Sequence, residues 1–233
     1  MPNKQSGFTL VEIAIVLVII GLLLGGVLKG QELINSAKVK NFATDFRNIP
    51  LFIYGYQDKF KSLPGDDARV TSNVPGSTAA TNGTLGNAVI EGRWDATFAT
   101  GPLFESFLFW QHVRLAGLAA GPTVTSDSNY LPKNADGGII GITSNVTSAP
   151  YIAGMRGTYM VCSTSILGNY AKQLDTTLDD GCTNTGSMMV VANGLAGTTT
   201  NNTALGLTTT TGSACVGSAA IDDSTSYTVC LGI

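Results

Sequence analysis

The sequence places one carboxylate inside its most apolar stretch. Residues 8–28 read FTLVEIAIVLVIIGLLLGGVL, and Glu12 is the only ionisable side chain among them. As a helix with a rise of about 1.5 Å per residue, this stretch is about 30 Å long, which matches the hydrocarbon thickness of a bilayer. A carboxylate at the centre of such a helix costs about 2.5 to 3.5 kcal/mol on insertion scales, and less near the interface. Glu12 therefore requires a cationic partner.

The apolar run itself contains no cation for Glu12. Lys4 precedes the run, and Lys29 follows it on what would be the opposite side of a membrane. A cut directly before Phe8 would create an α-amine one helical turn from Glu12. A secretory signal peptide fits less well, because its apolar region normally covers about 7 to 15 residues and ends in a small-residue cleavage site. A buried helix of a soluble protein also fits less well, because no other segment approaches this hydrophobicity.

Four cysteines lie in the last third of the sequence, namely Cys162, Cys182, Cys215 and Cys230. In an exported domain this even number argues for two disulfides, with three alternative connectivities. We predict pairing between sequence neighbours, Cys162 with Cys182 and Cys215 with Cys230. Closing the short loop of the second pair would stabilise the fold by about 3 kcal/mol in the chain-entropy description. A zinc site is disfavoured, because the sequence has no CxxC spacing and one histidine.

Acidic residues occur in three adjacent pairs that could bind Ca²⁺ through oxygen atoms. The pairs are Asp66-Asp67, Asp179-Asp180 and Asp222-Asp223. Adjacent aspartates at turns are more often solvated or capping groups, and the sequence shows no EF-hand spacing. The sequence therefore predicts no resident cofactor, with Asp66, Asp67, Asp179 and Asp180 retained as Ca²⁺ candidates.

The sequence offers little material for catalysis. His112 is the only histidine, and it lies in an apolar stretch, where a hydrogen-bonded or surface histidine is more common than a catalytic base. No GxSxG, HExxH, GxGxxG or P-loop pattern is present. Lys172 is the last basic residue, so the acidic C-terminal part disfavours phosphate binding. We predict a protein that is not an enzyme, has no catalytic residues and does not bind nucleic acid.

Residues 4–12 read KQSGFTLVE and lead directly into the apolar run. A short leader with a lysine, a glycine, an aromatic residue and a glutamate five positions after the glycine resembles the class III signal of type IV prepilins and type II secretion pseudopilins. In that family a membrane peptidase cuts after the glycine and methylates the new amine, and the apolar helix stays on the mature protein. The resemblance implies cleavage between Gly7 and Phe8, N-methylation of Phe8, and a role for Glu12 in subunit assembly.

The helix is predicted to continue beyond the apolar run. Aromatic and aliphatic residues recur every three or four positions and share one helical face, as expected for an amphipathic helix. They are Phe42, Phe46, Ile49, Ile53, Tyr56 and Phe60. A Leu-Pro-Gly-Asp sequence at residues 63–66 should end this helix. This sequence, together with residues 178–181 and the C-terminal cysteines, also resembles pilin-like proteins of Gram-negative bacteria, a weaker likeness than that of the signal.

The rest of the chain predicts an α+β fold. After an irregular stretch over residues 62–101, a short helix should begin after Pro102, and a second one should cover residues 166–178. Short β-branched or apolar runs bounded by turn residues predict strands at residues 138–143, 158–163, 187–192 and 227–231. The resemblance to pilins implies that the long N-terminal helix packs on this small antiparallel sheet.

The sequence therefore predicts four segments with different surroundings. These are a leader at residues 1–7, a transmembrane or filament-core helix at 8–28, the amphipathic half of that helix at 29–61, and a globular pilin domain at 62–233. The resemblance implies a structural subunit of a type IV pilus or related filament. The alternatives are a pseudopilin of a type II secretion system and a minor tip pilin acting as an adhesin.

The resemblance also implies the partners and the location of the protein. The expected partners are copies of the chain itself, other pilin-like subunits, a prepilin peptidase and an inner-membrane assembly platform. The chain should first lie in the bacterial inner membrane as a single-pass protein. It should then move to the cell surface in a pilus or to a periplasmic pseudopilus.

Overall fold

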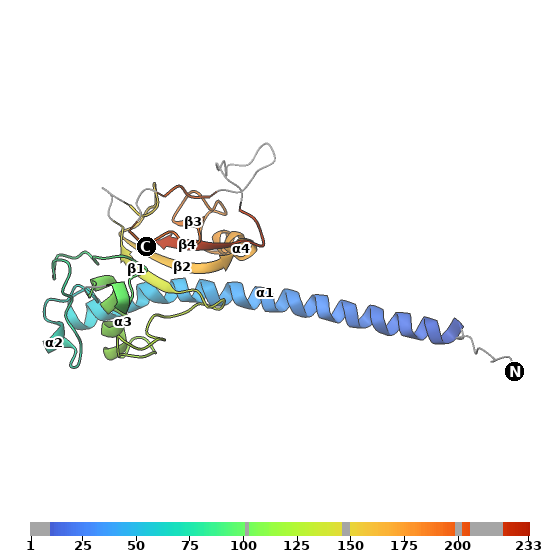
Figure 1. Cartoon of the computed structure of the whole chain (residues 1–233), viewed down its shortest axis with the longest axis horizontal. Helices are drawn as coiled ribbons and strands as arrows, with labels where there is room; N and C mark the ends of the chain where they lie inside the picture. Colours follow the sequence, from blue (N-terminus) through green and yellow to red (C-terminus); the bar gives the residue numbers. More distant parts are fainter. Residues whose placement is uncertain (1–9, 101–102, 146–149, 199–201, 206–220) are drawn as a thin grey trace. The chain divides into compact units, whose positions relative to one another are not determined.

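The protein is seen in a computed structural model, which describes residues 10–100, 103–145, 150–198, 202–205 and 221–233. The chain divides into two units, one from Met1 to Lys38 and the other from Val39 to Ile233. One long helix, α1, contributes residues to both units (Figure 1). Every other helix and strand belongs to the second unit.

Helix α1 runs from Leu10 to Phe60 and passes through Pro50 without ending. Its first part exposes its apolar side chains, whereas from Val39 onward one face is buried. The buried face carries the predicted apolar stripe, and its members include Phe42, Phe46, Ile49, Ile53 and Tyr56. Burial of each of these large side chains contributes about 1.5 to 3 kcal/mol. The second part of α1 is therefore a core element of the second unit.

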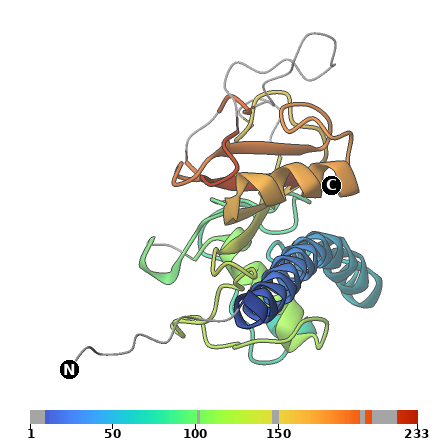
Figure 2. The same ribbon diagram turned by 90° about the vertical axis from the view of Figure 1, so that its right-hand side faces the viewer.

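A four-stranded antiparallel sheet forms the other layer of this unit. Its strands are β1 (Ile140–Ser144), β2 (Tyr159–Leu167), β3 (Met188–Ala192) and β4 (Ser226–Gly232). They are hydrogen-bonded in the order β1-β2-β4-β3, so the fourth strand in the chain is an interior strand. Figure 2 shows the sheet as a layer, and α4 (Gly168–Leu178), the helix that follows β2, lies against it. The α+β, pilin-like fold predicted from the sequence is confirmed.

Both faces of the sheet are buried, by different partners. Alternate residues such as Val161, Val190 and Val229 join the core that contains the stripe of α1. Their neighbours, such as Cys162 and Met189, point to the opposite face, where loop residues cover them. The covering residues include Trp94, Tyr151, Ile152 and Met155. This arrangement explains why the strands are apolar at consecutive positions rather than alternating.

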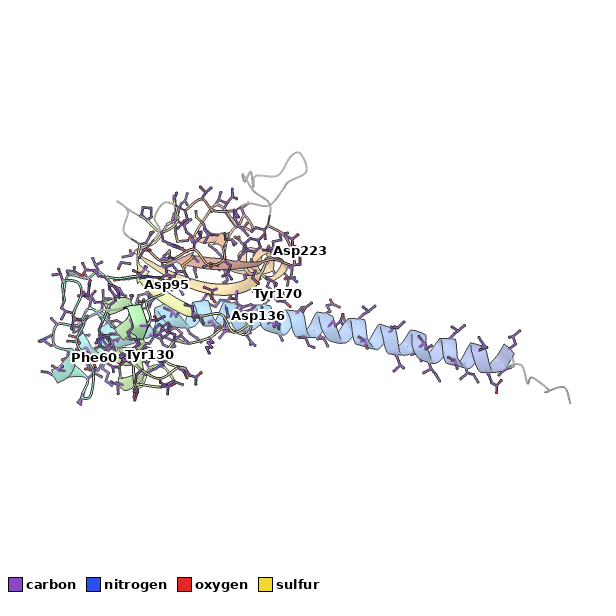
Figure 3. The ribbon with its side chains drawn as sticks, in the orientation of Figure 1. Phe60, Asp95, Tyr130, Asp136, Tyr170 and Asp223 are labelled. Atoms are coloured by element: carbon purple, nitrogen blue, oxygen red, sulfur yellow. A yellow bond between two sulfur atoms is a disulfide. The ribbon has the colours of Figure 1, made fainter. Side chains whose placement is uncertain are left out.

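The described residues contain four further short helical segments, three between α1 and β1 and one between β2 and β3. They are α2 (Val70–Asn73), the single 3₁₀ turn η1 (Phe98–Thr100), α3 (Glu105–Leu115) and α4 (Gly168–Leu178). Helix α3 joins the main core through Phe107, Leu108 and Val113. Helix α4 joins it through Tyr170, whose ring centroid lies 6.0 Å from that of Phe42 (Figure 3).

Candidate functional site

Glu12 lies in the first turn of α1, where a carboxylate interacts favourably with the positive end of the helix dipole. Its side chain is exposed. Gly7 and Phe8, the predicted cleavage and methylation positions, lie outside the described residues, which begin at Leu10. Glu12 is therefore at the N-terminal end of the helix, next to the position where cleavage would create the new amine.

The surface of α1 around and beyond Glu12 is apolar on all sides. Leu10 is 86% exposed and Leu22 is 73% exposed, and the other large side chains of this part are also uncovered. None of the most apolar window of α1 is buried, and the helix is long and apolar enough to cross a membrane. Lys29 and Glu32, which form a 2.6 Å salt bridge, mark the return of polar residues. A helix that is apolar all round needs lipid or other helices as its surroundings.

The disulfide pairing predicted from the sequence is wrong. Cys162 and Cys230 are bonded to each other, so neither predicted pair can form. The two residues lie directly opposite each other on β2 and β4, with Cα atoms 4.0 Å apart. The prediction failed because it paired sequence neighbours, whereas the sheet places β4 beside β2. Cys182 is also disulfide-bonded, and Cys215 lies outside the described residues.

Asp66 and Asp67, two of the Ca²⁺ candidates, accept hydrogen bonds from neighbouring segments just after α1 ends. Asp66 accepts from the backbone N–H groups of residues 86–88, with the Ala88 nitrogen at 2.7 Å. Asp67 accepts from the Tyr56 hydroxyl at 3.0 Å and from the Arg69 backbone N–H at 2.8 Å. Burial raises the pKa of the Asp66 carboxyl, which the backbone donors partly offset. Both residues therefore act as structural acceptors in the turn that ends α1.

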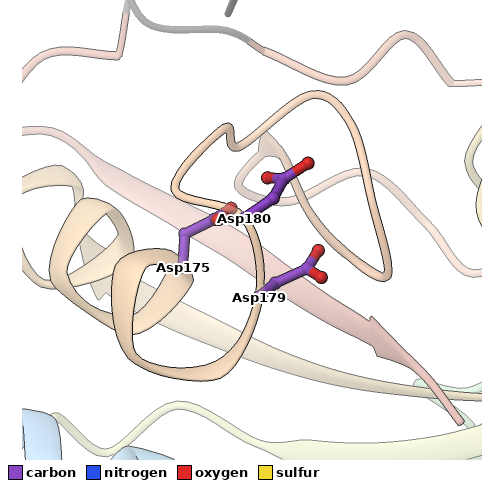
Figure 4. Close-up of side chains that lie close together, drawn as sticks. All are labelled: Asp175, Asp179 and Asp180. Atoms are coloured by element: carbon purple, nitrogen blue, oxygen red, sulfur yellow. The ribbon is translucent and has the colours of Figure 1, made fainter.

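The other two Ca²⁺ candidates lie beside a third acid that sequence analysis missed. Asp179 and Asp180 follow α4, and Asp175 lies in its last turn. Among the described residues, these three form the one group of at least three potential metal ligands with mutually close atoms (Figure 4). The missed signal was the four-residue spacing of Asp175 and Asp179, which places these two residues on one side of the helix end.

The comparisons with known proteins concern the N-terminal part. Residues 2–28 match the family model of the prokaryotic N-terminal methylation motif. The chain carries a class III signal. Such a signal is typical of type IV pilins and pseudopilins, as the resemblance implied. No curated protein and no solved structure is significantly similar to the chain.

The match is confined to residues 2–28, and it accompanies the α+β, pilin-like fold described above. Proteins with this signal are generally structural subunits without enzymatic activity. The signal implies processing by a prepilin peptidase and assembly with pilin-like subunits. Together with the apolar helix, it also implies anchoring in the inner membrane before assembly.

His112 is a buried structural residue. Its Nδ1 accepts a hydrogen bond from the Gly65 backbone N–H at 2.9 Å, and its Nε2 lies 2.8 Å from the Thr78 carbonyl oxygen. Because a carbonyl only accepts, Nε2 carries the proton and the ring is neutral. Burial lowers the pKa of His112, an effect that the Thr78 carbonyl and the Asp67 charge partly offset. His112 thus joins α3 to the turn that follows α1.

We expect acid to weaken this connection. The pKa of His112 is below its ordinary value of 6.5, so its neutral form stabilises the folded chain fully above about pH 6.5 and less as the pH falls. Each pH unit in this window costs up to about 1.4 kcal/mol. In His112→Gln this titration is absent, while all the carboxyl groups remain. The difference in unfolding free energy between wild type and His112→Gln, measured by urea titration, should be largest at neutral pH and should shrink in acid. A difference that does not change with pH would contradict the assignment.

Proposed function

We propose that the chain is a structural subunit of a type IV pilus or a related filament. Prepilin peptidase removes residues 1–7, residues 8–28 hold the subunit in the inner membrane, and the globular part lies outside the cytoplasm. Assembly then transfers residues 8–28 from lipid into a core made of the same helices from other subunits. The chain contributes structure to the filament and has no catalytic role.

The uncovered apolar surface of α1 is the observation that supports this proposal. Nothing among the described residues packs on its most apolar window. In a membrane, lipid chains contact this surface, and in a filament, neighbouring helices contact it instead. Both surroundings are apolar, so the exchange requires little change in hydrophobic free energy. Specific contacts, including those of Glu12, can then decide whether a subunit is incorporated.

The composition of the sequence favours a pilus over a secretion pseudopilus. Lys, Arg, Asp and Glu form 12% of the sequence, about half the share that is usual in soluble proteins. Uncharged Thr, Ser, Asn and Gly residues are common in their place. To test this assignment, filaments sheared from intact cells should be examined for the chain by immunoblotting. Recovery in the sheared fraction supports a pilus, and retention in the periplasm would support a pseudopilus.

Leader removal is the first testable step. In cells that contain a prepilin peptidase, the mature chain should begin with N-methylated Phe8. Gly7→Val should remain uncut, because a branched side chain next to the bond is expected to obstruct the approach of the peptidase. Intact-mass measurement and N-terminal peptide mapping of the membrane fraction would detect both results.

A leader variant that keeps the glycine provides the matched control. Ser6→Ala changes the neighbouring position without adding bulk at the bond, so it should be cut and methylated as in wild type. A mature chain that begins after residue 28 would identify a secretory signal peptide and overturn the proposal. A wild-type chain that retains Met1 despite an active peptidase would overturn it as well.

A further inference from the structure

A small pocket lies between the second part of α1, helix α3 and the start of β1. Its volume is about 160 Å³. Its apolar wall includes Ile49 and Phe52 of α1, Pro132 from the loop before β1, and Ile140, the first residue of β1. A cavity of about 150 Å³ is large enough for a molecule the size of benzene. The pocket therefore suits a small ligand with an apolar part.

Arg114 of α3 lines this pocket and has no carboxylate partner among the described residues. The residue is 7% exposed, and its guanidinium lies over the rings of Trp110 and Tyr130, at 5.8 Å and 5.3 Å from their centroids. Burial lowers the pKa of Arg114, an effect that Tyr130 partly offsets. A buried charge without a counter-charge is costly, so the pocket holds a cation that an anion would stabilise.

The described residues use one nitrogen of this guanidinium. Nη1 of Arg114 donates to the carbonyl oxygens of Pro122 and Tyr130, at 2.8 Å and 2.5 Å. Nε is buried without a hydrogen-bond partner, and Nη2 donates to no acceptor among the described residues. The buried indole N–H of Trp110, which also lines the pocket, has no partner either. Arginine commonly binds a carboxylate through two hydrogen bonds, and two of its nitrogens are left for that purpose.

The same pocket contains a carboxylate without a cationic partner. Asp45 of α1 lines it, is half-buried and has a pKa that burial raises to about 6. None of the salt bridges among the described residues involves Asp45. Asp45 and Arg114 thus line one pocket without pairing with each other. A ligand that carries both a positive and a negative group would neutralise both residues.

We propose that this pocket binds a small aliphatic α-amino acid in its zwitterionic form. The carboxylate of the ligand accepts hydrogen bonds from the guanidinium of Arg114. The ammonium group of the ligand donates to the carboxylate of Asp45. The aliphatic side chain of the ligand contacts the apolar wall, which includes Ile49, Phe52 and Ile140. Small-molecule sites commonly combine an apolar lining with a few polar groups that fix the orientation of the ligand.

An α-amino acid matches the two charges of the pocket better than other small ligands do. An inorganic anion would leave Asp45 without a cation, and a metal ion would leave Arg114 without an anion. In an α-amino acid one carbon atom carries both the ammonium and the carboxylate, so a molecule of benzene size can contact both residues. The site goes beyond the proposed structural role and does not depend on it, because all the lining residues belong to the unit from Val39 to Ile233.

The test measures the binding of L-alanine and L-valine to the full chain. Wild-type protein in a non-ionic detergent is titrated by calorimetry slightly above neutral pH, where Asp45 is ionised. Saturable binding of one ligand molecule per chain is expected. L-Valinamide lacks the carboxylate of L-valine, and 2-hydroxy-3-methylbutanoate has a hydroxyl in place of the ammonium group. Each analogue should bind at least about tenfold more weakly than L-valine, because hydrogen bonds to charged groups contribute at least this factor.

Asp45→Asn should remove the preference for an ammonium group. L-Valine should bind to this variant at least about tenfold more weakly than to wild type. The hydroxy acid should bind at least as well as before, because it has no ammonium group to lose a partner, whereas a distorted pocket would lose both ligands. Asp58→Asn is the matched control, since Asp58 lies on the same helix, has a 92% exposed side chain and does not line the pocket. It should bind L-valine as wild type does.

Arg114→Lys tests the other end of the ligand. This substitution keeps the positive charge but loses the planar pair of donors. L-Valine and the hydroxy acid should therefore both bind more weakly, in contrast to the selective loss in Asp45→Asn. If Arg114→Lys fails to fold, the two analogues on the wild-type chain and the Asp45→Asn variant still decide the proposal.

Three results would overturn the proposal. The first is a wild-type chain that binds neither L-alanine nor L-valine saturably at millimolar concentrations. The second is equal affinity for L-valine and one of its two analogues, which would indicate a site for a single charge. The third is undiminished binding of L-valine by Asp45→Asn, which would place the ligand elsewhere. A chain that binds L-valine but never enters filaments would contradict the proposed function and leave the amino-acid site standing.

Discussion

Filaments assembled from Glu12→Ala subunits alone are expected at a small fraction of the wild-type yield, although the variant should be inserted into the membrane, cleaved and folded normally. The substitution removes the only carboxylate of the apolar run. It changes nothing in the globular unit, which begins at Val39. The defect should therefore appear at the assembly step only.

The expected loss follows from charge pairing in an apolar core. Cleavage would leave a cationic amine on Phe8, and a subunit that joins a filament would bring this amine among apolar helices. Pairing with the Glu12 carboxylate of a neighbouring subunit neutralises both charges at one axial offset. Removing one partner of a buried ion pair costs about 3 to 5 kcal/mol, mainly because the other charge is left uncompensated. This cost corresponds to more than about a hundredfold weaker incorporation per subunit.

The measurement compares the sheared filament fraction with the membrane-bound pool of mature subunits. Glu12→Asp, which is one methylene shorter, should give an intermediate yield and serves as the conservative control. If cells in which Glu12→Ala is the only subunit gave the wild-type yield of filaments, the pairing hypothesis would be wrong. A block already at leader cleavage would point instead to recognition of Glu12 by the peptidase.

Loss of the disulfide between Cys162 and Cys230 should have the largest effect on the stability of the globular unit. The bond joins residues that are 68 positions apart in the sequence. In the chain-entropy description, closing a loop of this length stabilises the fold by about 4 kcal/mol. A Cys162→Ala and Cys230→Ala double variant, which leaves no new unpaired thiol, should lose about this much unfolding free energy in urea titrations. Leader removal should be unaffected.

Peptide mapping under non-reducing conditions tests the connectivity directly. A Cys162 peptide should be linked to a Cys230 peptide. Cys215 is the one other cysteine in the sequence, so Cys182 should be linked to it. A link between Cys162 and Cys182 would contradict the cross-strand pairing. Unchanged stability of the double variant would show that strand contacts alone hold β2 to β4.

The sequence alone located the helices and strands, because the patterns that predict them, periodicity and turn residues, are local in the sequence. The apolar stripe that ends at Phe60 predicted the end of α1 correctly. Each predicted strand overlaps an observed one, and the prediction for residues 187–192 differs from β3 by one residue. Lys61, directly after the last residue of α1, has a φ of +56°, and Gly65 follows in the Leu-Pro-Gly turn with a φ of +96° and its α-carbon facing the Glu105 carbonyl. Turn residues and periodicity carry this information without tertiary structure.

The sequence did not reveal which distant residues meet. The pairing of Cys162 with Cys230 depends on the position of β4 between β2 and β3, which no local pattern encodes. The roles of Asp66 and Asp67 depend on donors from residues 86–88 and from Tyr56. The spacing of Asp175 from Asp179 is visible in the sequence, but the burial of Asp175 is not. Sheet order and burial are tertiary properties, so these sites required the structure.

The interior position of β4 bears on when the domain can fold. Strands β2 and β3 do not pair with each other, and both pair with β4, which follows them in the chain. Until Gly232 has emerged from the ribosome and any export channel, β3 lacks its hydrogen-bonding partner. Unpaired strand edges of this kind favour aggregation. The sheet should therefore be completed only once β4 has been exported, and oxidation of Cys162 and Cys230 should coincide with that step.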